Sequence, residues 1–180
     1  MKPDGLVYEP EFIAPAEEAA LLGAVRALPL EEARYREFTA KRRVAIFDAP
    51  PAFLLPLRDR LAAWMRLPAT DLSYTLINEY RPGTALGWHR DSPEYESVAG
   101  VSLGAACRMR FRPWPHAKGN RESLELLLEP RSAYMMRGAV RWAWQHSVPA
   151  VKELRYSITF RTPRTQGLQR AGHGVVEARR

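Results

Sequence analysis

Two histidines and an aspartate form the pattern in this sequence that is best suited to chemistry. His89 and Asp91 stand two positions apart within residues 86–91, a strand-like stretch. On a strand, alternate side chains share a face, so we expect His89 and Asp91 to point the same way. His146 ends a second strand-like stretch, residues 141–146. Two histidines and one carboxylate on one face of a metal, with other positions open, are typical of non-haem Fe(II) sites that use oxygen.

An alternating segment near the end of the chain predicts an anion receptor. Its polar face comprises Arg155, Ser157, Thr159 and Arg161, and the intervening residues are apolar. Arg155 and Ser157 together offer a guanidinium and a hydroxyl, which suit a carboxylate. The ends of the strand lie roughly 20 Å apart at the usual rise per residue. Two arginines that lean inward from these ends could therefore hold opposite ends of a short dicarboxylate, but not the same end. The alternative is a solvated strand face with exposed arginines.

The apolar pattern predicts the elements that must position these groups. One helical stripe comprises Leu21, Leu22, Val25 and Leu28, and a second comprises Leu54, Leu57, Leu61 and Met65. Eight short strands follow, expected over residues 73–80, 86–91, 98–103, 108–112, 123–128, 132–136, 141–146 and 155–161. Two helices before eight strands predict an α+β fold, with a double-stranded β-helix (jelly-roll) core and supporting N-terminal helices.

Length and composition predict one domain. The chain has 180 residues, and we expect a domain over 1–163, a jelly-roll core over 70–162 and a basic, mobile tail over 164–180. No apolar run reaches membrane length, and the N-terminus lacks the apolar core of a signal peptide. The single cysteine, Cys107, permits no internal disulfide. These features predict a cytoplasmic monomer with no membrane association and no obligate protein partner.

The charge of the chain favours a polyanionic partner. The net charge is +7, but residues 1–40 carry four basic and eight acidic side chains, which leaves +11 on the remainder. Nucleic acid is the first candidate, and a basic surface that serves solubility alone is the alternative. Arg108, Arg110 and Arg112 alternate with apolar residues. This run indicates either a nucleic-acid face or an exposed edge strand guarded by arginine.

Taken in order, the motifs resemble those of a known family. They cover about residues 70–162 and comprise Asn78-Glu79-Tyr80, Pro82-Gly83, His89-x-Asp91, Val101-Ser102-Leu103-Gly104, His146 and Arg155 with Arg161. This joint pattern resembles the AlkB family, Fe(II)- and 2-oxoglutarate-dependent dioxygenases that repair alkylated nucleobases. It is far more specific than the pair His89 and Asp91 alone.

The resemblance implies a role for each residue of the motifs. The catalytic Fe(II) would be bound by His89, Asp91 and His146, with O2 and 2-oxoglutarate as cosubstrates. Contacts to 2-oxoglutarate would come from Arg155 at the distal carboxylate, Ser157 beside it, Asn78, Tyr80, and Arg161 near the metal-bound end.

The resemblance also implies a substrate. The enzyme would oxidise N-alkyl groups on bases of DNA or RNA, releasing formaldehyde, succinate and CO2, after the base leaves its stack. Residues 35–47 would form a nucleotide-recognition lid, in which Phe38 stacks on the base or packs in the core, and Arg42 and Arg43 contact phosphate. A bacterial member of the family selects the base with an acidic residue two positions after the ligand aspartate. Pro93 occupies that position here, so Glu94 is the substitute candidate.

Three other functions compete with this prediction. The same chemistry could act on a protein or a small molecule, although the basic surplus favours nucleic acid. A non-catalytic jelly-roll binding module would not need an intact triad together with both arginines. A zinc hydrolase would not need the carboxylate-binding strand.

Overall fold

The computed structural model describes residues 2–35, 38–118 and 122–164, with the backbone alone at 34, 35 and 38–41. Its strands are β1 (Leu6–Glu9), β2 (Glu31–Tyr35), β3 (Phe38–Phe47), β4 (Tyr74–Tyr80), β5 (Leu86–His89), β6 (Tyr95–Gly104), β7 (Cys107–Pro113), β8 (Leu124–Leu128), β9 (Ala133–Met136), β10 (Trp144–Val148) and β11 (Arg155–Pro163). Its helices are α1 (Pro15–Arg26), α2 (Leu55–Met65) and α3 (Ala139–Trp142), with 3-10 turns η1 (Ala52–Leu54) and η2 (Ala69–Asp71). No helix in the described ranges is long and apolar enough to cross a membrane.

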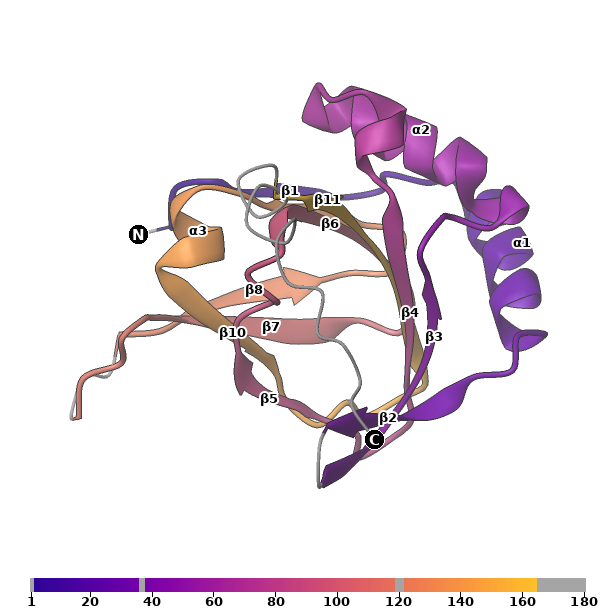
Figure 1. The fold of residues 1–180 in the computed structure, drawn as a ribbon. Coiled ribbons are helices and arrows are strands. Elements are labelled where there is room, and N and C mark those ends of the chain that lie inside the picture. The colour runs from indigo at the N-terminus through magenta and orange to yellow at the C-terminus, as the bar shows by residue number, and fades with distance from the viewer. Residues whose placement is uncertain (1, 36–37, 119–121, 165–180) are drawn as a thin grey trace, which may run out of the picture.

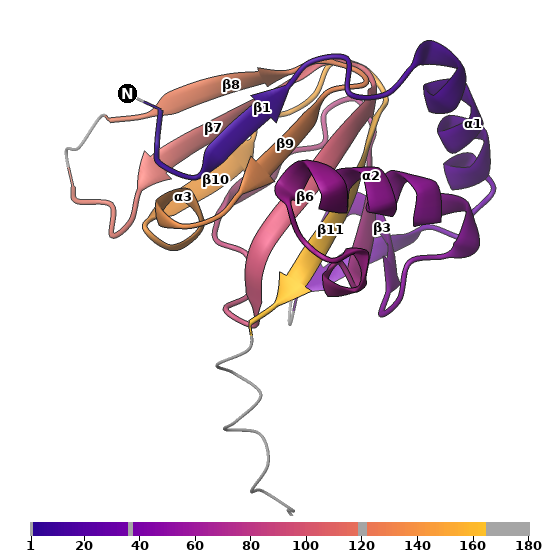
Figure 2. The ribbon, with the colours of Figure 1, turned by 90° about the horizontal axis from the view of Figure 1, so that it is seen from above.

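The strands form two antiparallel sheets that face each other (Figures 1 and 2). In the described residues the large sheet has the order β1-β9-β6-β11-β4-β3-β2, and the small sheet has the order β5-β10-β7-β8. Helices α1 and α2 lie against the outer face of the large sheet (Figures 1 and 2). This arrangement confirms the predicted jelly-roll with supporting N-terminal helices.

Two apolar cores hold these three layers together. The outer core lies between the helices and the large sheet, where the stripe of α2 buries Leu57, Leu61 and Met65. Each of these side chains contributes roughly 1.5–3 kcal/mol when fully buried. The inner core lies between the sheets and includes Phe111 and Met109 of β7. The polar side chains of β11 on the inward face of the large sheet are therefore enclosed between the two sheets.

The alternation of β11 assigns one face of the strand to each core. Ile158 and Phe160 are fully buried in the outer core beneath the helices. The face carrying Arg155 and Arg161 points inward between the sheets, where it lines a cavity. The predicted alternative, a solvated face with exposed arginines, is wrong because both arginines are buried.

Two of the predicted strands end earlier or begin later than expected. Strand β5 ends at His89, so Asp91 lies in the following loop and does not share a strand face with His89. Trp142 and Arg141 belong to α3, which begins after Gly138 at a positive φ of 59°. Neither segment alternates strongly enough in apolar residues for its end to be read from sequence.

The hairpin of β2 and β3 was not predicted as part of the sheet. It adds two strands to the large sheet, with β3 paired to β4 from Arg43 opposite Glu79 to Phe47 opposite Thr75. The basic residues at the start of β3 obscure its apolar alternation. The segment predicted to be a lid is therefore largely a sheet extension beside the cavity.

Candidate active site

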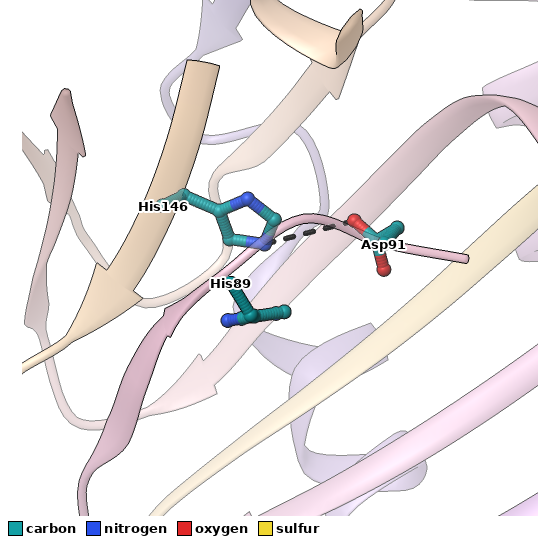
Figure 3. Close-up of side chains that lie close together, drawn as sticks. All are labelled: His89, Asp91 and His146. Atoms are coloured by element: carbon teal, nitrogen blue, oxygen red, sulfur yellow. Dashed lines mark ion pairs between the residues drawn. The ribbon is translucent and has the colours of Figure 1, made fainter. Parts of the chain in front are cut away.

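Three side chains with metal-ligand atoms converge between the sheets. His89 and His146 face each other across the pairing of β5 with β10, with ring centroids 4.2 Å apart. Asp91 approaches from the loop after β5, and its Oδ2 lies 3.6 Å from His146 Nε2 (Figure 3). One ligand atom from each residue lies within 4.8 Å of the others. Tertiary structure thus brings the triad together although Asp91 lies outside the strand.

The surroundings of these three groups favour their metal-binding protonation states. Burial, opposed only partly by Asp91, lowers the pKa of His89, and burial lowers the pKa of His146 to about 3. Burial by itself would raise the pKa of Asp91, but Arg161 and the two histidines outweigh it and lower that pKa. Neutral imidazoles and an ionised carboxylate are the forms that a divalent cation needs.

A backbone contact selects which nitrogen of His89 is available. Its Nδ1 lies 2.8 Å from the carbonyl oxygen of Gly87, so Nδ1–H donates to that oxygen. The lone pair of Nε2 is then free for a metal. A hydrogen bond of this kind fixes both the tautomer and the ring orientation of a ligating histidine.

Arg155 is a buried cation whose contacts with the described residues leave its charge uncompensated. The residue is 2% exposed, its Nε donates to Ser102 Oγ at 3.1 Å, and its guanidinium lies 5.1 Å from the ring centre of Tyr80. No carboxylate pairs with Arg155 in the part of the chain that the structure describes. Burial of an unpaired charge is strongly unfavourable, so the site fits an anionic ligand.

Asn78 adds an unsatisfied polar group to the same cavity. Its Nδ2 donates to Ser157 Oγ at 3.2 Å, and its buried Oδ1 has no hydrogen-bond partner among the described residues. Rotation of the amide would let the Ser157 hydroxyl donate to Oδ1 and would free the N–H groups for a carboxylate. Both arrangements leave hydrogen-bonding capacity for a ligand.

Arg161 lies at the triad end of the same strand face. Its Nη2 and Nε donate to Asp91 Oδ1 at 2.9 and 3.3 Å, and its Nη1 donates to Thr159 Oγ1 at 3.1 Å. This ion pair orients the Asp91 carboxylate and compensates its charge. The two arginines of β11 thus line one cavity, with Arg155 at Tyr80 and Arg161 at Asp91.

The site consists of an inner cavity that opens into a groove. The inner cavity is lined by the triad, by the polar face of β11, and by Asn78 and Tyr80 of β4. The groove, of about 850 Å³, is lined by the hairpin of β2 and β3, by β4 and by the loop after Asp91. Four residues line both spaces, namely Arg42, Leu76, Asp91 and Arg161. A substrate in the groove would therefore reach the triad directly.

A comparison with protein-family models shows which family has this arrangement of residues. The 2OG-Fe(II) oxygenase superfamily matches residues 7–161, which include the triad and both arginines. The chain belongs to the 2OG-Fe(II) oxygenase superfamily.

Two of the relatives that this chain matches carry names that indicate nucleic-acid chemistry. The chain is 28% identical over 181 residues to the Alkylated DNA repair protein ALKBH8 homolog of Arabidopsis thaliana, covering 81% of this chain and 51% of that protein. It is 24% identical over 170 residues to the Probable RNA/DNA demethylase ALKBH6 of Danio rerio, covering 84% and 72%. An uncharacterized mimivirus protein, L905, is 33% identical over 102 residues, covering 48% and 46%. These relatives confirm the resemblance to the AlkB family, and the chain spans about half the length of two of them.

Solved structures share the fold of this oxygenase. OsALKBH1 has a TM-score of 0.67 at 15% identity, covering 90% of this chain and 98% of that one. A Pseudomonas putida prolyl-4-hydroxylase has a TM-score of 0.66 at 16% identity, covering 89% and 93%. At these identities the likeness supports the jelly-roll fold alone.

The residues of this 2OG-Fe(II) oxygenase fit the groups that the superfamily uses. The convergent donors of the triad suit Fe(II), whose preferred protein ligands here are two imidazoles and one carboxylate. The uncompensated Arg155 and the unsatisfied Asn78 Oδ1 suit the far end of 2-oxoglutarate in the inner cavity. When bound, Fe(II) supplies activation of O2 coupled to oxidation of this cosubstrate.

The two arginines predicted to contact phosphate point in different directions. Arg42 is 5% exposed and lines both the inner cavity and the groove. Arg43 lies on the other face of β3, where its guanidinium pairs with Glu79 at 3.0 Å and donates to the Leu30 carbonyl oxygen at 2.7 and 3.2 Å. Arg43 thus donates to groups within the protein on the face away from the groove, and its contact with phosphate stays a prediction.

The other two predicted substrate residues are Phe38 and Glu94. Phe38 is the first residue of β3, and its side chain lies outside the described residues, so its stacking role stays a prediction. Glu94 is exposed, and it is absent from the described lining of both the groove and the inner cavity. The loop turns so that Tyr95 faces the groove, and a base-selecting role for Glu94 stays a prediction.

Several residues of the site were assigned no role from the sequence. Tyr74 and Tyr95 line the groove with ring centroids 4.9 Å apart. Tyr134 closes the inner cavity opposite Gly100, where a side-chain Cβ would come within 2.6 Å of the Tyr134 ring. Ser102 contacts Arg155 from within a motif of the resemblance. The tyrosines come from three different strands, so no local spacing could have grouped them.

Proposed function

We propose that this protein is an Fe(II)- and 2-oxoglutarate-dependent dioxygenase that removes N-alkyl groups from bases of DNA or RNA. The observation that carries the proposal is a metal-ligand triad in the same cavity as a buried Arg155 that has no carboxylate partner among the described residues. A hydrolase would need the first but not the second. A binding module without catalysis would need neither a triad nor an anion receptor next to it.

The residues of the chain would divide the work along the polar face of β11. Arg155 would hold the distal carboxylate of 2-oxoglutarate, assisted by Ser157 and Asn78. Tyr80, beneath the guanidinium, would shape that end of the cavity. Arg161 would hold Asp91 in the orientation that binds the metal. The two sheets and Tyr134 would exclude bulk water, which strengthens each of these electrostatic contacts.

The groove supports a nucleobase as the substrate. It is within the size range of ligand sites, and Tyr74 and Tyr95 offer aromatic surface close to the triad. Arg42 adds a cation at the junction of groove and cavity. The names of the ALKBH8 and ALKBH6 relatives point to the same substrate class. A base would have to leave its stack to enter.

The proposed reaction balances without a further reductant. One oxygen atom of O2 enters the N-methyl group as a hydroxyl, and the other enters the succinate formed when 2-oxoglutarate loses CO2. The resulting N-hydroxymethyl group releases formaldehyde when its C–N bond breaks and the base nitrogen regains a proton.

Mass spectrometry of defined substrates tests this proposal. The purified chain is incubated with Fe(II), ascorbate, 2-oxoglutarate and N-methylated single-stranded DNA, duplex DNA or RNA. We expect loss of one methyl group from at least one substrate, with equimolar succinate and formaldehyde. Succinate formation without demethylation of any of them would refute the nucleobase substrate and favour a hydroxylase of protein or small molecules.

A further inference from the structure

The outward face of the small sheet carries a row of arginines that the site does not use. Arg108 and Arg110 of β7 are exposed, and Arg112 is half-buried on the same face, whereas Met109 and Phe111 point into the inner core. β7 lies between β10 and β8, so it is not an edge strand. Arginines that guard an exposed edge, one of the two predicted explanations, are therefore excluded.

Positive charge is in excess on this face. Arg108 Nη1 and Arg110 Nε both donate to Glu125 of β8, each at 2.9 Å, so two guanidiniums share one carboxylate. Within the described ranges of the chain, no carboxylate pairs with Arg90 or Arg112. Two guanidiniums thus share the Glu125 carboxylate, and two more have no carboxylate partner among the described residues, which favours an anionic partner.

Two tryptophans lie among these arginines. The Arg112 guanidinium lies 4.4 Å from the ring centre of Trp88, and the Arg90 guanidinium lies 5.0 Å from that of Trp114. Trp114 is 42% exposed. Solvated polar strand faces are common, but an exposed indole beside cations is typical of surfaces on which bases stack. An acidic protein segment would pair with the arginines but would leave the indoles unused.

This face continues into the groove of the active site. Arg90 follows the metal-ligand candidate His89, and its Nη1 donates to the Trp142 carbonyl oxygen at 3.2 Å. The next residue, Asp91, and then Tyr95 line the groove. A strand leaving the groove along this loop would therefore arrive on the outward face of the small sheet, which α1 and α2 leave uncovered (Figures 1 and 2).

We propose that this surface binds the single-stranded nucleic acid that flanks the base in the groove. It is termed the arginine–tryptophan face and comprises Trp88, Arg90, Arg108, Arg110, Arg112 and Trp114. The arginines of β7 lie roughly 7 Å apart along the strand, comparable to successive phosphates of an extended chain. The substrate class rests on the proposed function.

Charge removal on the face tests this proposal directly. The variant R108Q/R110Q is compared with R58Q/R60Q, which removes two ion-paired surface arginines from α2. Affinity is measured by fluorescence anisotropy for an unmodified single-stranded oligonucleotide of about 20 nucleotides. We expect R108Q/R110Q alone to bind about tenfold more weakly, with a salt dependence of log K shallower by roughly 1.4. Equal affinity of the two variants would overturn the proposal.

Stacking is tested separately at Trp114. We expect Trp114→Ala to weaken binding about fivefold or more and Trp114→Phe to preserve most of it, because both bases and phenyl rings have flat faces. Wild-type affinity for Trp114→Ala would contradict the proposal that bases stack on Trp114. Binding of polyglutamate in preference to the oligonucleotide would overturn the proposal and assign the face to an acidic protein.

Measurements of demethylation distinguish the proposed nucleic-acid surface from the proposed function of the active site. A methylated trinucleotide is too short to reach from the groove across the face, so R108Q/R110Q should demethylate it at the wild-type rate. A wild-type protein that demethylates nothing, while R108Q/R110Q still loses affinity, would refute the proposed function and leave the nucleic-acid face standing.

Discussion

Two buried polar clusters lie back to back on the pairing of β4 with β11. On the outer face, Glu79 accepts hydrogen bonds from the Tyr156 hydroxyl, Arg43 Nη1 and Arg81 Nε, each at 3.0 Å. Burial would raise the pKa of Glu79, but its hydrogen bonds and the two arginines outweigh burial and lower it. The charge of this cluster is satisfied within the protein, so it needs no ligand.

On the inner face, the neighbouring residues form the opposite kind of cluster. Ser157 and Asn78 stand opposite each other one position along from Tyr156 and Glu79. Here Arg155 has no carboxylate partner among the described residues, and Asn78 Oδ1 accepts no hydrogen bond from them. Both faces carry buried polar groups beside arginine, so what distinguishes a ligand site is polar capacity left unused.

Removal of the Asp91 carboxylate should have the largest effect on the activity of the inner site. We expect Asp91→Ala to reduce 2-oxoglutarate turnover by about a thousandfold or more, because one of three metal ligands is lost. The visible absorption of added Co(II) should weaken in parallel, which reports on metal binding without activity. Asp59→Ala, at an exposed aspartate of α2, is the control. Turnover by Asp91→Ala at the wild-type rate would disprove the triad.

Removal of the unpaired charge should separate function from stability. We expect Arg155→Met, which keeps the volume but loses the guanidinium, to raise the Michaelis constant for 2-oxoglutarate about a hundredfold. The free energy of unfolding without 2-oxoglutarate should not fall, because replacing an uncompensated buried charge by an apolar group is often neutral or stabilising. Succinate assays and urea unfolding measure the two quantities. An unchanged Michaelis constant would place Arg155 outside the cosubstrate site.

The equivalent change on the outer face should give the reverse result. We expect Glu79→Gln to lower the free energy of unfolding by about 2 kcal/mol, because Arg43 and Arg81 lose the charge that pairs with them. The Michaelis constant for 2-oxoglutarate should stay as in the wild type. A raised Michaelis constant with unchanged stability would mean that the two clusters are not independent.

The loss of stability in Glu79→Gln should depend on pH because the pKa of Glu79 is lowered in the folded protein. The group is ionised in both states above its ordinary pKa of 4.5, so the stabilisation is complete there. Below pH 4.5 Glu79 is protonated in the unfolded state before it is protonated in the folded state. The stabilisation is therefore lost as the pH falls from 4.5 through the lower pKa of the folded state. The difference in unfolding free energy between wild type and Glu79→Gln should therefore be constant above about pH 5.5 and shrink below pH 4.5.

The sequence predicted the parts of the site that depend on local alternation. The faces of β11 follow from alternation of polar and apolar residues, because a strand between two packed layers must direct apolar side chains to one of them. The helical stripe of α2 was equally readable, since Leu57 and Leu61 recur at helical spacing. The resemblance supplied the metal and cosubstrate residues, whose individual roles stay predictions.

Residues whose direction depends on loops or on neighbouring strands could not be assigned from the sequence. Arg42 and Arg43 are adjacent and chemically identical, yet one faces the groove and the other is paired with Glu79. Only the register of β3 against β4 decides between them, because a shift by one residue would exchange their faces. The sequence likewise did not predict that Tyr95 faces the groove while Glu94 is exposed, since the loop after Asp91 has no repeating geometry.

By itself, the sequence determined which residue types are available and which of them share a strand face. It determined the pair of arginines on β11 and the histidines, because short-range periodicity and composition are encoded locally. Only the tertiary structure decided that Asp91 reaches the histidines from a loop and that Arg155 is buried with no carboxylate partner among the described residues. Burial and convergence depend on contacts between strands far apart in the chain, and the local pattern around each residue does not contain that information.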